Sequence, residues 1–178
     1  MNPVDELYKR IDAANLWEKA ILLRRNAFLK HPGTIDTHLY YIVSGSVKVA
    51  LPDEPEEHIL RFGYRDNFVS ALDSFITGQP SELSIQALKK TEVKVLPKQP
   101  YLAFIHSAPE HKQLWDTLLE QLLLQQMERE IDILIRSPQE RYRRVFARSP
   151  RLFQEVPHKY IAAYLRMSPE TLSRLKKS

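Results

Sequence analysis

One stretch without proline or glycine constrains the fold of this chain more than any other feature. It runs from Glu110 to Ser137 and carries apolar residues on one broad side, namely Leu114, Trp115, Leu118, Leu119, Leu122, Leu123, Met127, Ile131 and Leu134. This pattern predicts a single helix about 40 Å long, since each helical residue adds roughly 1.5 Å. A small domain does not need such a length to cover its own core. We therefore expect one edge of the stripe to pack on the same chain and the other on a second copy.

Serine and proline mark both ends of this helix. Ser107-Ala108-Pro109-Glu110 has the pattern of a capping box, in which the serine oxygen accepts a free amide and the glutamate returns the bond. Ser137-Pro138-Gln139-Glu140 repeats the pattern and predicts the start of another helix, which ends at Ser149-Pro150. We expect the long helix over residues 107–136 and a hinge at Arg136-Ser137-Pro138.

The segment before the long helix has the pattern of β-structure. Leu39 to Val43 is a run typical of a buried strand, and Gly45 marks a turn after it. Val47, Val49 and Leu51 then alternate with Lys48 and Ala50, which predicts a second strand. Further short strands are expected at 58–62, 83–88 and 91–96, whereas residues 4–26 show the period of a helix. The chain is therefore predicted to be α+β, with an N-terminal double-stranded β-helix (a β-roll or jelly roll) and flanking helices.

The composition of the chain excludes several classes of site. The chain of 178 residues has no cysteine, which excludes disulfides, thiolate zinc and cysteine-ligated iron–sulfur clusters. The polar N-terminus does not have the pattern of a signal peptide, and no apolar run approaches the roughly 20 residues of a membrane helix. We expect a cytoplasmic protein without a membrane partner.

The positive charge is concentrated at the C-terminal end. Residues 136–178 hold eleven Lys and Arg against three Asp and Glu, a balance of +8, so the other 135 residues carry −4 of the net +4. A basic end on an acidic body is typical of a polyanion-binding region. Charge alone leaves a merely solubilising surface equally open.

Two short helices are predicted at that end. Pro157 can start one and Ser168-Pro169 the other, with a turn of two or three residues between them, which is the spacing of a helix-turn-helix. We expect Ile161, Leu165, Leu172 and Leu175 in the shared core, and Ala162 is small enough for the two helices to cross closely. The DNA-binding residues would be Ser168, Pro169, Glu170, Thr171, Ser173, Arg174, Lys176 and Lys177. The alternative is a generic helical hairpin with a solvated face.

The chain resembles the Crp/Fnr family of bacterial transcription regulators, especially the short forms common in Bacteroidetes. The matching blocks are residues 39–49, Ser137 to Tyr142, and Ile161 through Arg174. The resemblance implies a β-roll sensor (1–106), a dimerisation helix (107–136) and a DNA-binding helix-turn-helix (137–178). It also implies a homodimer on a palindrome, with double-stranded DNA and RNA polymerase as partners.

Within that resemblance, Glu170 and Arg174 match base-reading residues, and Pro169 stands where the catabolite activator has another base-reading arginine. The dimer contacts are expected from Trp115, Leu118, Leu119, Leu122 and Ile131. Two departures are notable. The sequence ends at Ser178, so we expect no β-wing, and Arg166 occupies the place of the usual turn glycine.

The nucleotide-binding cassette of the family is not preserved. In its place Ala71 replaces the ribose glutamate, Ser81 the arginine and Glu82 the serine or threonine. A carboxylate would repel a cyclic phosphate, so we expect no ordinary binding of cyclic AMP and no cofactor. Another effector pocket is predicted from Ser70, Ala71, Ser74, Ser81, Glu82 and Ser84, with Arg61 or Arg65 near an anionic ligand. The alternative is a roll kept only as a scaffold.

Two other functions remain as alternatives. The chain could be a ligand-binding or protein-interaction module that has lost specific DNA binding. An enzyme is the least expected, because no nucleophile–base pair or glycine-rich phosphate loop is present. The six histidines are scattered, so no metal site is predicted.

Overall fold

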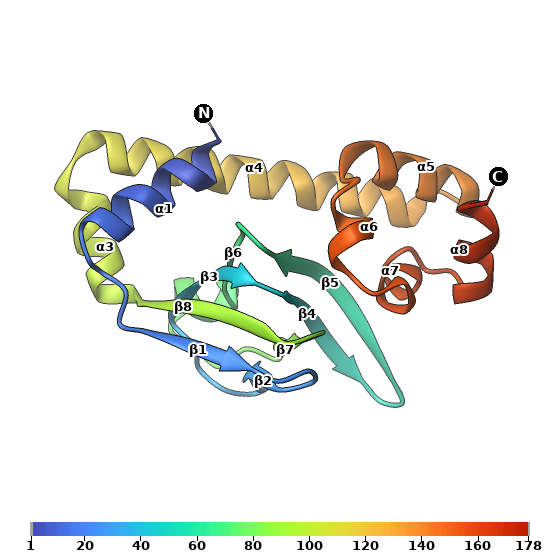
Figure 1. Ribbon diagram of the computed structural model, residues 1–178, viewed down its shortest axis with the longest axis horizontal. Helices are drawn as coiled ribbons and strands as arrows, with labels where there is room; N and C mark the ends of the chain where they lie inside the picture. Colours follow the sequence, from blue (N-terminus) through green and yellow to red (C-terminus); the bar gives the residue numbers. More distant parts are fainter. Residues whose placement is uncertain (1, 178) are drawn as a thin grey trace.

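Two four-stranded antiparallel sheets face each other in the computed structural model, which describes residues 2–177 (Figure 1). One sheet has the order β1 (Lys19–Leu23), β8 (Thr91–Pro97), β3 (His38–Ser44) and β6 (Phe68–Val69). The other has the order β2 (Phe28–Lys30), β7 (Ser84–Ala87), β4 (Ser46–Asp53) and β5 (Glu56–Tyr64), and α2 (Leu72–Thr77) follows β6. The predicted α+β fold with a β-roll is confirmed.

The interior of the roll is apolar, and its turns follow the glycines. Ile42, Val47 and Ile85 are fully buried between the sheets. Gly45 joins β3 to β4 with φ +87°, and a Cβ there would lie 2.4 Å from the Lys90 carbonyl. Only glycine fits this turn, because both the backbone angle and the space exclude a side chain.

The prediction of a helix over residues 4–26 is wrong beyond residue 13. Helix α1 (Pro3–Ala13) buries Leu7 and Ile11, and then ends where Asn15 takes a positive φ of 51°. The Asn15 amide donates to the Asp12 carbonyl (3.0 Å) and the Leu16 amide to the Ile11 carbonyl (3.3 Å), the two bonds of a Schellman motif. Residues 19–23 form β1 instead, because β8 offers a complete row of antiparallel partners.

Helix α4 (Pro109–Leu134) is the long helix, and it spans the molecule above the roll (Figure 1). The predicted serine cap at its start is wrong. Ser107 is the last residue of a further helix, α3 (Lys98–Ser107), and its hydroxyl donates to the Phe104 carbonyl at 2.7 Å. Ala108 is the N-cap of α4 and supplies no side-chain bond.

Four short helices gather at the other end of α4 (Figure 1). These are α5 (Pro138–Arg148), α6 (Leu152–Glu155), α7 (His158–Tyr164) and α8 (Pro169–Leu175). The predicted break in the helix lies between Leu134 and Pro138, and Ser137 caps α5 by accepting the Glu140 amide at 3.2 Å. The Glu140 carboxylate does not return the bond but pairs with Arg143 at 2.8 Å.

The short helices share a hydrophobic core with the roll. Ile59 and Phe62 of β5 pack in one cluster with Val145 of α5 and Ile161 of α7. The Ser46 hydroxyl also donates to the Glu155 carbonyl at 3.0 Å. This core fixes α5–α8 against one edge of the roll. Within residues 2–177, no helix is both long and apolar enough to cross a membrane.

Candidate nucleic-acid interface

Helices α7 and α8 cross as the sequence predicts. Ile161, Ala162 and Leu165 are fully buried, and Leu172 is 1% exposed. Leu175 is half-buried. The small side chain of Ala162 lets the two helices approach closely. The apolar side of α8 is thus used inside the molecule, which leaves its other side to solvent.

The turn between α7 and α8 contains an arginine in the left-handed region. Arg166 has φ +53°, its amide donates to the Ala163 carbonyl (3.1 Å), and the Met167 amide donates to the Ala162 carbonyl (3.0 Å). This is the same Schellman pattern that ends α1. Arg166 therefore has the positive φ that glycine adopts most easily, although it carries a side chain.

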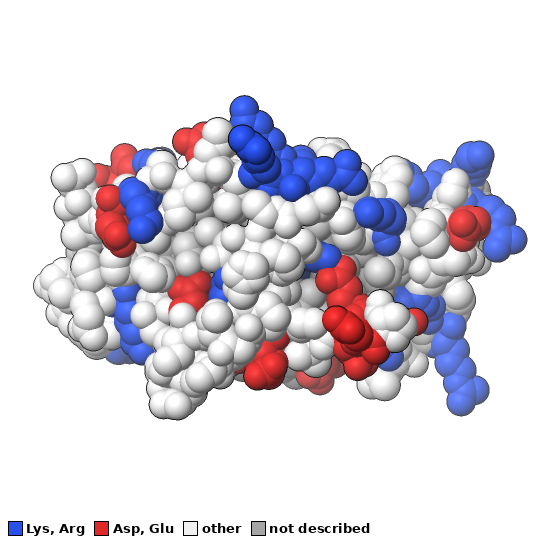
Figure 2. Space-filling view, turned by 90° about the horizontal axis from the view of Figure 1, so that it is seen from below, with Lys and Arg blue, Asp and Glu red and all other residues white. Residues whose placement is uncertain are grey.

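The free side of α8 carries most of the predicted DNA-binding residues. The exposed ones are Ser168, Pro169, Glu170, Ser173, Arg174, Lys176 and Lys177. On the face drawn in Figure 2, most of the charged side chains at the end of the molecule that holds α7 and α8 are Lys and Arg. Thr171 differs, because it is half-buried and its amide donates to the Ser168 hydroxyl at 3.1 Å. It belongs to the cap of the helix more than to its free side.

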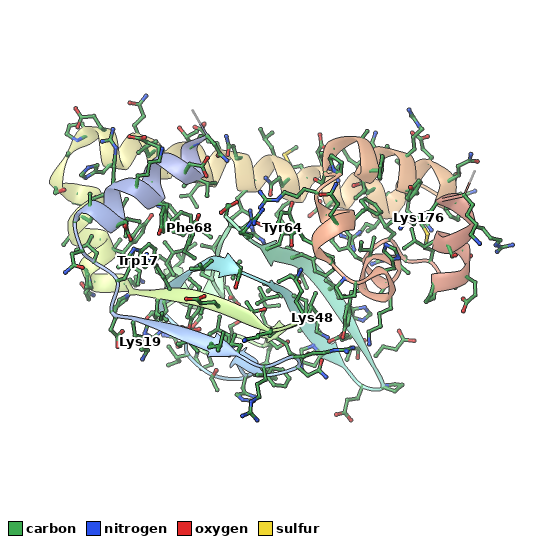
Figure 3. All side chains as sticks on the ribbon, in the orientation of Figure 1. Trp17, Lys19, Lys48, Tyr64, Phe68 and Lys176 are labelled. Carbon is green, nitrogen blue, oxygen red and sulfur yellow. The ribbon has the colours of Figure 1, made fainter. Side chains whose placement is uncertain are left out.

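Local contacts set the charge of this surface. The pKa of the Glu170 carboxyl is lowered by a hydrogen bond from its own backbone amide, by the Ser168 hydroxyl and by the charge of Arg174. Glu170 is therefore an anion at neutral pH and can only accept hydrogen bonds. The Lys176 amine lies 2.6 Å from the His158 ring at the start of α7 (Lys176 is labelled in Figure 3), so it bridges the two helices.

Buried ionic contacts hold α5 to α4, and the sequence analysis did not predict them. Asp132 of α4 is fully buried and accepts from Arg144 (3.0 Å) and from Arg148 of α5. Arg141 is 8% exposed and donates to four backbone carbonyls, those of Ile135, Arg136, Leu165 and Arg166. An arginine one turn into α5 gave no sequence signal that distinguished it from its exposed neighbours.

The two edges of α4 have different surroundings. Trp115, Leu118, Leu119 and Leu122 are half-buried and line a cavity against the roll of the same chain. Of the five residues predicted for the dimer contact, only Ile131 lies on the exposed edge. On that edge it lies beside Leu124, Met127 and Leu134. The exposed fractions of these four residues range from 47% to 79%. We call these four residues the apolar seam. Their spacing of three, four and three residues is that of a coiled-coil contact.

The predicted effector residues do not gather into one pocket. Ser74 is buried, accepts the Asp36 amide (2.9 Å) and donates to the Gln79 carbonyl (2.7 Å). Ala71, Ser81 and Ser84 are also buried, and Glu82 is exposed. Ser70 alone of the six lines the cavity beneath α4. The hydroxyls of Ser74, Ser81 and Ser84, which were expected to meet a ligand, are instead hydrogen-bonded to the backbone of the same domain.

A buried lysine, Lys30, binds the backbone of the segment that contains Ser81. Lys30 is 3% exposed, and its ammonium donates to the carbonyls of His31 (2.9 Å), Ser81 (2.8 Å) and Leu83 (2.6 Å). Lys30 of β2 therefore binds the backbone of Ser81 and Leu83, in the segment that the sequence aligns with the nucleotide-binding cassette. Among residues 2–177, no three His, Asp or Glu side chains cluster closely enough to hold a metal ion.

Comparisons with known proteins agree with this architecture. Residues 21–108 match a family model described as the cyclic nucleotide-binding domain. No curated protein sequence matches the chain significantly.

Among solved structures, the catabolite activator protein of Thermus thermophilus is 22% identical with a TM-score of 0.60, over 99% of this chain and 85% of that one. FixK2 from Bradyrhizobium japonicum is 15% identical with a TM-score of 0.72, over 89% and 82%. The c-di-GMP responsive global regulator CLP of Xanthomonas campestris is 16% identical with a TM-score of 0.68, over 97% and 90%. The chain thus contains a cyclic nucleotide-binding domain match in residues 21–108 and has the fold of these regulators.

Proposed function

We propose that this protein is a Crp/Fnr-type transcription regulator that binds a palindromic DNA operator as a homodimer. The observation that carries the proposal is the division of α8 into two sides. Leu172 is buried against α7, whereas Glu170, Ser173 and Arg174 are exposed on a basic end of the molecule. A helix anchored in this way can enter the major groove while its partner helix crosses the backbone.

The exposed residues have complementary roles in this proposal. Arg174 is suited to bond guanine through two N–H groups, and the ionised Glu170 can accept from the amino group of cytosine. Lys176, Lys177 and the capped end at Ser168 would meet phosphates and fix the register. Pro169 offers no hydrogen-bond donor, so we expect a half-site different from that of relatives with an arginine at this position.

The apolar seam supports the dimer. Four large apolar side chains at coiled-coil spacing are exposed in the single chain, and this is costly in water. A second copy related by a two-fold axis would cover the same patch on both chains. Two recognition helices held by one pair of long helices would then read two half-sites.

The roll is proposed to act without ordinary binding of cyclic AMP. Ala71 and Ser81 supply neither the carboxylate nor the guanidinium that the ligand needs, and Lys30 holds the Ser81 and Leu83 carbonyls. Cytoplasmic location and contact with RNA polymerase follow from the regulator role and are part of the same proposal.

The test is selection of bound fragments from a random duplex library by the purified protein, at physiological salt with no effector added. We expect a palindrome with half-site centres about one helical turn apart. An Arg174→Ala variant in the same selection should lose preference at one base pair per half-site. An Arg65→Ala variant, changed on the roll, is the matched control and should enrich the same palindrome.

A pool without any enriched motif would contradict the proposal. If the protein then retained weak, sequence-independent binding shared with other polyanions, the result would favour a module of this fold that has lost specific DNA recognition.

A further inference from the structure

A groove lies between the start of α7 and the exposed side of α8. Among the described residues, those that line it are His158, Pro169, Leu172, Ser173, Lys176 and Lys177. All of them except Leu172 are exposed, and no carboxylate is among them. The groove therefore offers positive charge and hydrogen-bond donors to an anion. It shares no lining residue with the cavity beneath α4.

The contact between His158 and Lys176 defines the state of the imidazole. The Lys176 amine lies 2.6 Å from Nε2 of His158. A lysine ammonium has only donors, so Nε2 has to accept this hydrogen bond. The ring in this contact is therefore neutral and carries its one hydrogen on Nδ1.

Protonation of His158 changes the contact. A hydrogen on Nε2 turns both groups into donors and places two cations against each other. An oxyanion between them can accept from both, with the Ser173 hydroxyl and the Lys177 amine in the same groove. The proton and the anion therefore favour each other's binding at this groove.

Other charged groups around α7 do not take the place of this anion. Lys159, next to His158 on α7, is a further cation, and its amine lies 4.6 Å from the ring centroid of Tyr160. Carboxylates on the surrounding elements have partners of their own. They are Glu57 of β5 with Lys48, Glu140 of α5 with Arg143, Glu155 of α6 with Lys89, and Glu170 of α8 with Ser168 and Arg174.

The position of the groove favours a phosphate of DNA over a free phosphate. Ser173 lines the groove and belongs to the side of α8 that is proposed to enter the major groove of DNA. Side chains beside a helix placed in this way reach the phosphates that fix its register. A site lined almost entirely by exposed side chains is also poorly suited to enclose a small metabolite.

We propose that this groove binds one phosphate of the DNA backbone and that His158 takes up a proton when it does. Histidine is the side chain that ordinarily changes its charge between about pH 5 and 8, so DNA binding strengthens as the pH falls through this range. The inference rests on the proposed binding of DNA. It does not rest on base reading or on the palindrome, because a phosphate contact is independent of sequence.

The experiment is fluorescence anisotropy of the full chain with a mixed-sequence duplex, at constant salt and in phosphate-free buffers of about pH 6 and about pH 8. We expect the wild type to bind roughly fivefold more tightly at the lower pH for each occupied groove, the factor given by two unit charges about 4 Å apart in water. His158→Gln should lose this gain. His158→Lys, which carries a fixed cation, should bind at the higher pH about as tightly as the wild type does at the lower one.

The matched control is His106→Gln. His106 is an exposed histidine of α3, at the opposite end of the molecule from α7 and α8 (Figure 1), and its replacement should keep the pH dependence of the wild type. Added inorganic phosphate, at constant ionic strength, should not change the affinity for the duplex.

The possible failures are distinguishable. If His158→Gln shows the same pH dependence as the wild type, the proton is taken up elsewhere and this inference is overturned, while the proposed DNA binding stands. Competition by inorganic phosphate would also overturn it, because the groove would then hold a free anion. If no duplex binds, the selected operator included, both this inference and the proposed function are overturned.

Discussion

The guanidinium of Arg141 donates its Nε hydrogen to the backbone carbonyl of Leu165 over 2.8 Å. The same group donates to the carbonyls of Ile135 (2.6 Å) and Arg166 (3.0 Å). One buried side chain therefore connects the end of α4 to the turn between α7 and α8. Because helix ends and turns have carbonyls without internal partners, this arginine satisfies acceptors that the backbone leaves unpaired.

Replacing Arg141 should destabilise the helix-turn-helix. We expect Arg141→Met to lower the free energy of unfolding by about 3 kcal/mol, since several charge-assisted bonds to buried carbonyls are removed together. Urea denaturation followed by circular dichroism measures the effect. Arg143→Met, at an exposed arginine of the same helix, should leave the midpoint unchanged. Equal midpoints for the two variants would show that Arg141 does not hold the turn.

Arg166 gives a prediction of the opposite sign. An L-residue with φ +53° carries a steric cost that glycine avoids, so Arg166→Gly should raise the unfolding free energy by about 1 kcal/mol. Ala163→Gly, on the exposed side of α7, is the control and should lower it by about 0.5–1 kcal/mol. Thermal unfolding of both variants checks the two signs. A less stable Arg166→Gly would mean that the side chain, and not the backbone angle, dominates at this turn.

The proposed homodimer should depend on the apolar seam. Ile131→Asp places a carboxylate in a seam that each copy would bury, so the dissociation constant of the dimer should rise roughly 100-fold or more. Ile131→Leu keeps the apolar surface and should remain dimeric. Sedimentation equilibrium distinguishes the two states. A dimer that tolerates Ile131→Asp would place the interface on another surface.

Local signals in the sequence account for much of the fold. The turn at Gly45 and the core positions of α7 and α8 follow from spacing and from single residue types, and the structure confirms them. The sequence pattern predicts too long an N-terminal helix because Ala20 and Ile21 also fit a 3.6-residue period. Their strand pairing with β8, about seventy residues away, leaves no trace in the local pattern.

The candidate sites are less accessible to sequence reasoning. Which edge of α4 faces solvent depends on where the roll packs, so the apolar stripe alone does not separate the half-buried Leu118 from the exposed Ile131. Alignment to the cassette places the effector serines together, but Lys30, about fifty residues earlier, binds the backbone of that segment. Asp132 with Arg148 and Arg141 with Leu165 are likewise contacts between elements, which spacing does not reveal.

Lys30 predicts a pH dependence. Burial lowers the pKa of its amine below 10.5, although Asp36, Asp73 and Glu82 partly oppose the shift. In alkaline solution below pH 10.5 the unfolded chain therefore binds more protons at this site than the folded chain, and stability rises with pH. The wild type should gain stability relative to Lys30→Met as pH rises toward 10.5. Urea midpoints of both proteins at several pH values measure this difference, and parallel curves would exclude a shifted amine.

Arg174 and Lys177 should affect DNA binding in different ways. If Arg174 reads a guanine, Arg174→Ala costs about 1–3 kcal/mol on the selected operator and little on duplexes altered at that base pair. If Lys177 neutralises a phosphate, Lys177→Ala weakens binding to all duplexes alike and lowers the slope of log affinity against log salt by about one. Fluorescence anisotropy at several salt concentrations separates the two patterns. Both residues are exposed at the same end of the molecule, in or directly after a seven-residue helix, so a merely basic surface would give them the same salt-dependent weakening and no change in base preference. That result would contradict base reading by α8 even if the protein bound DNA.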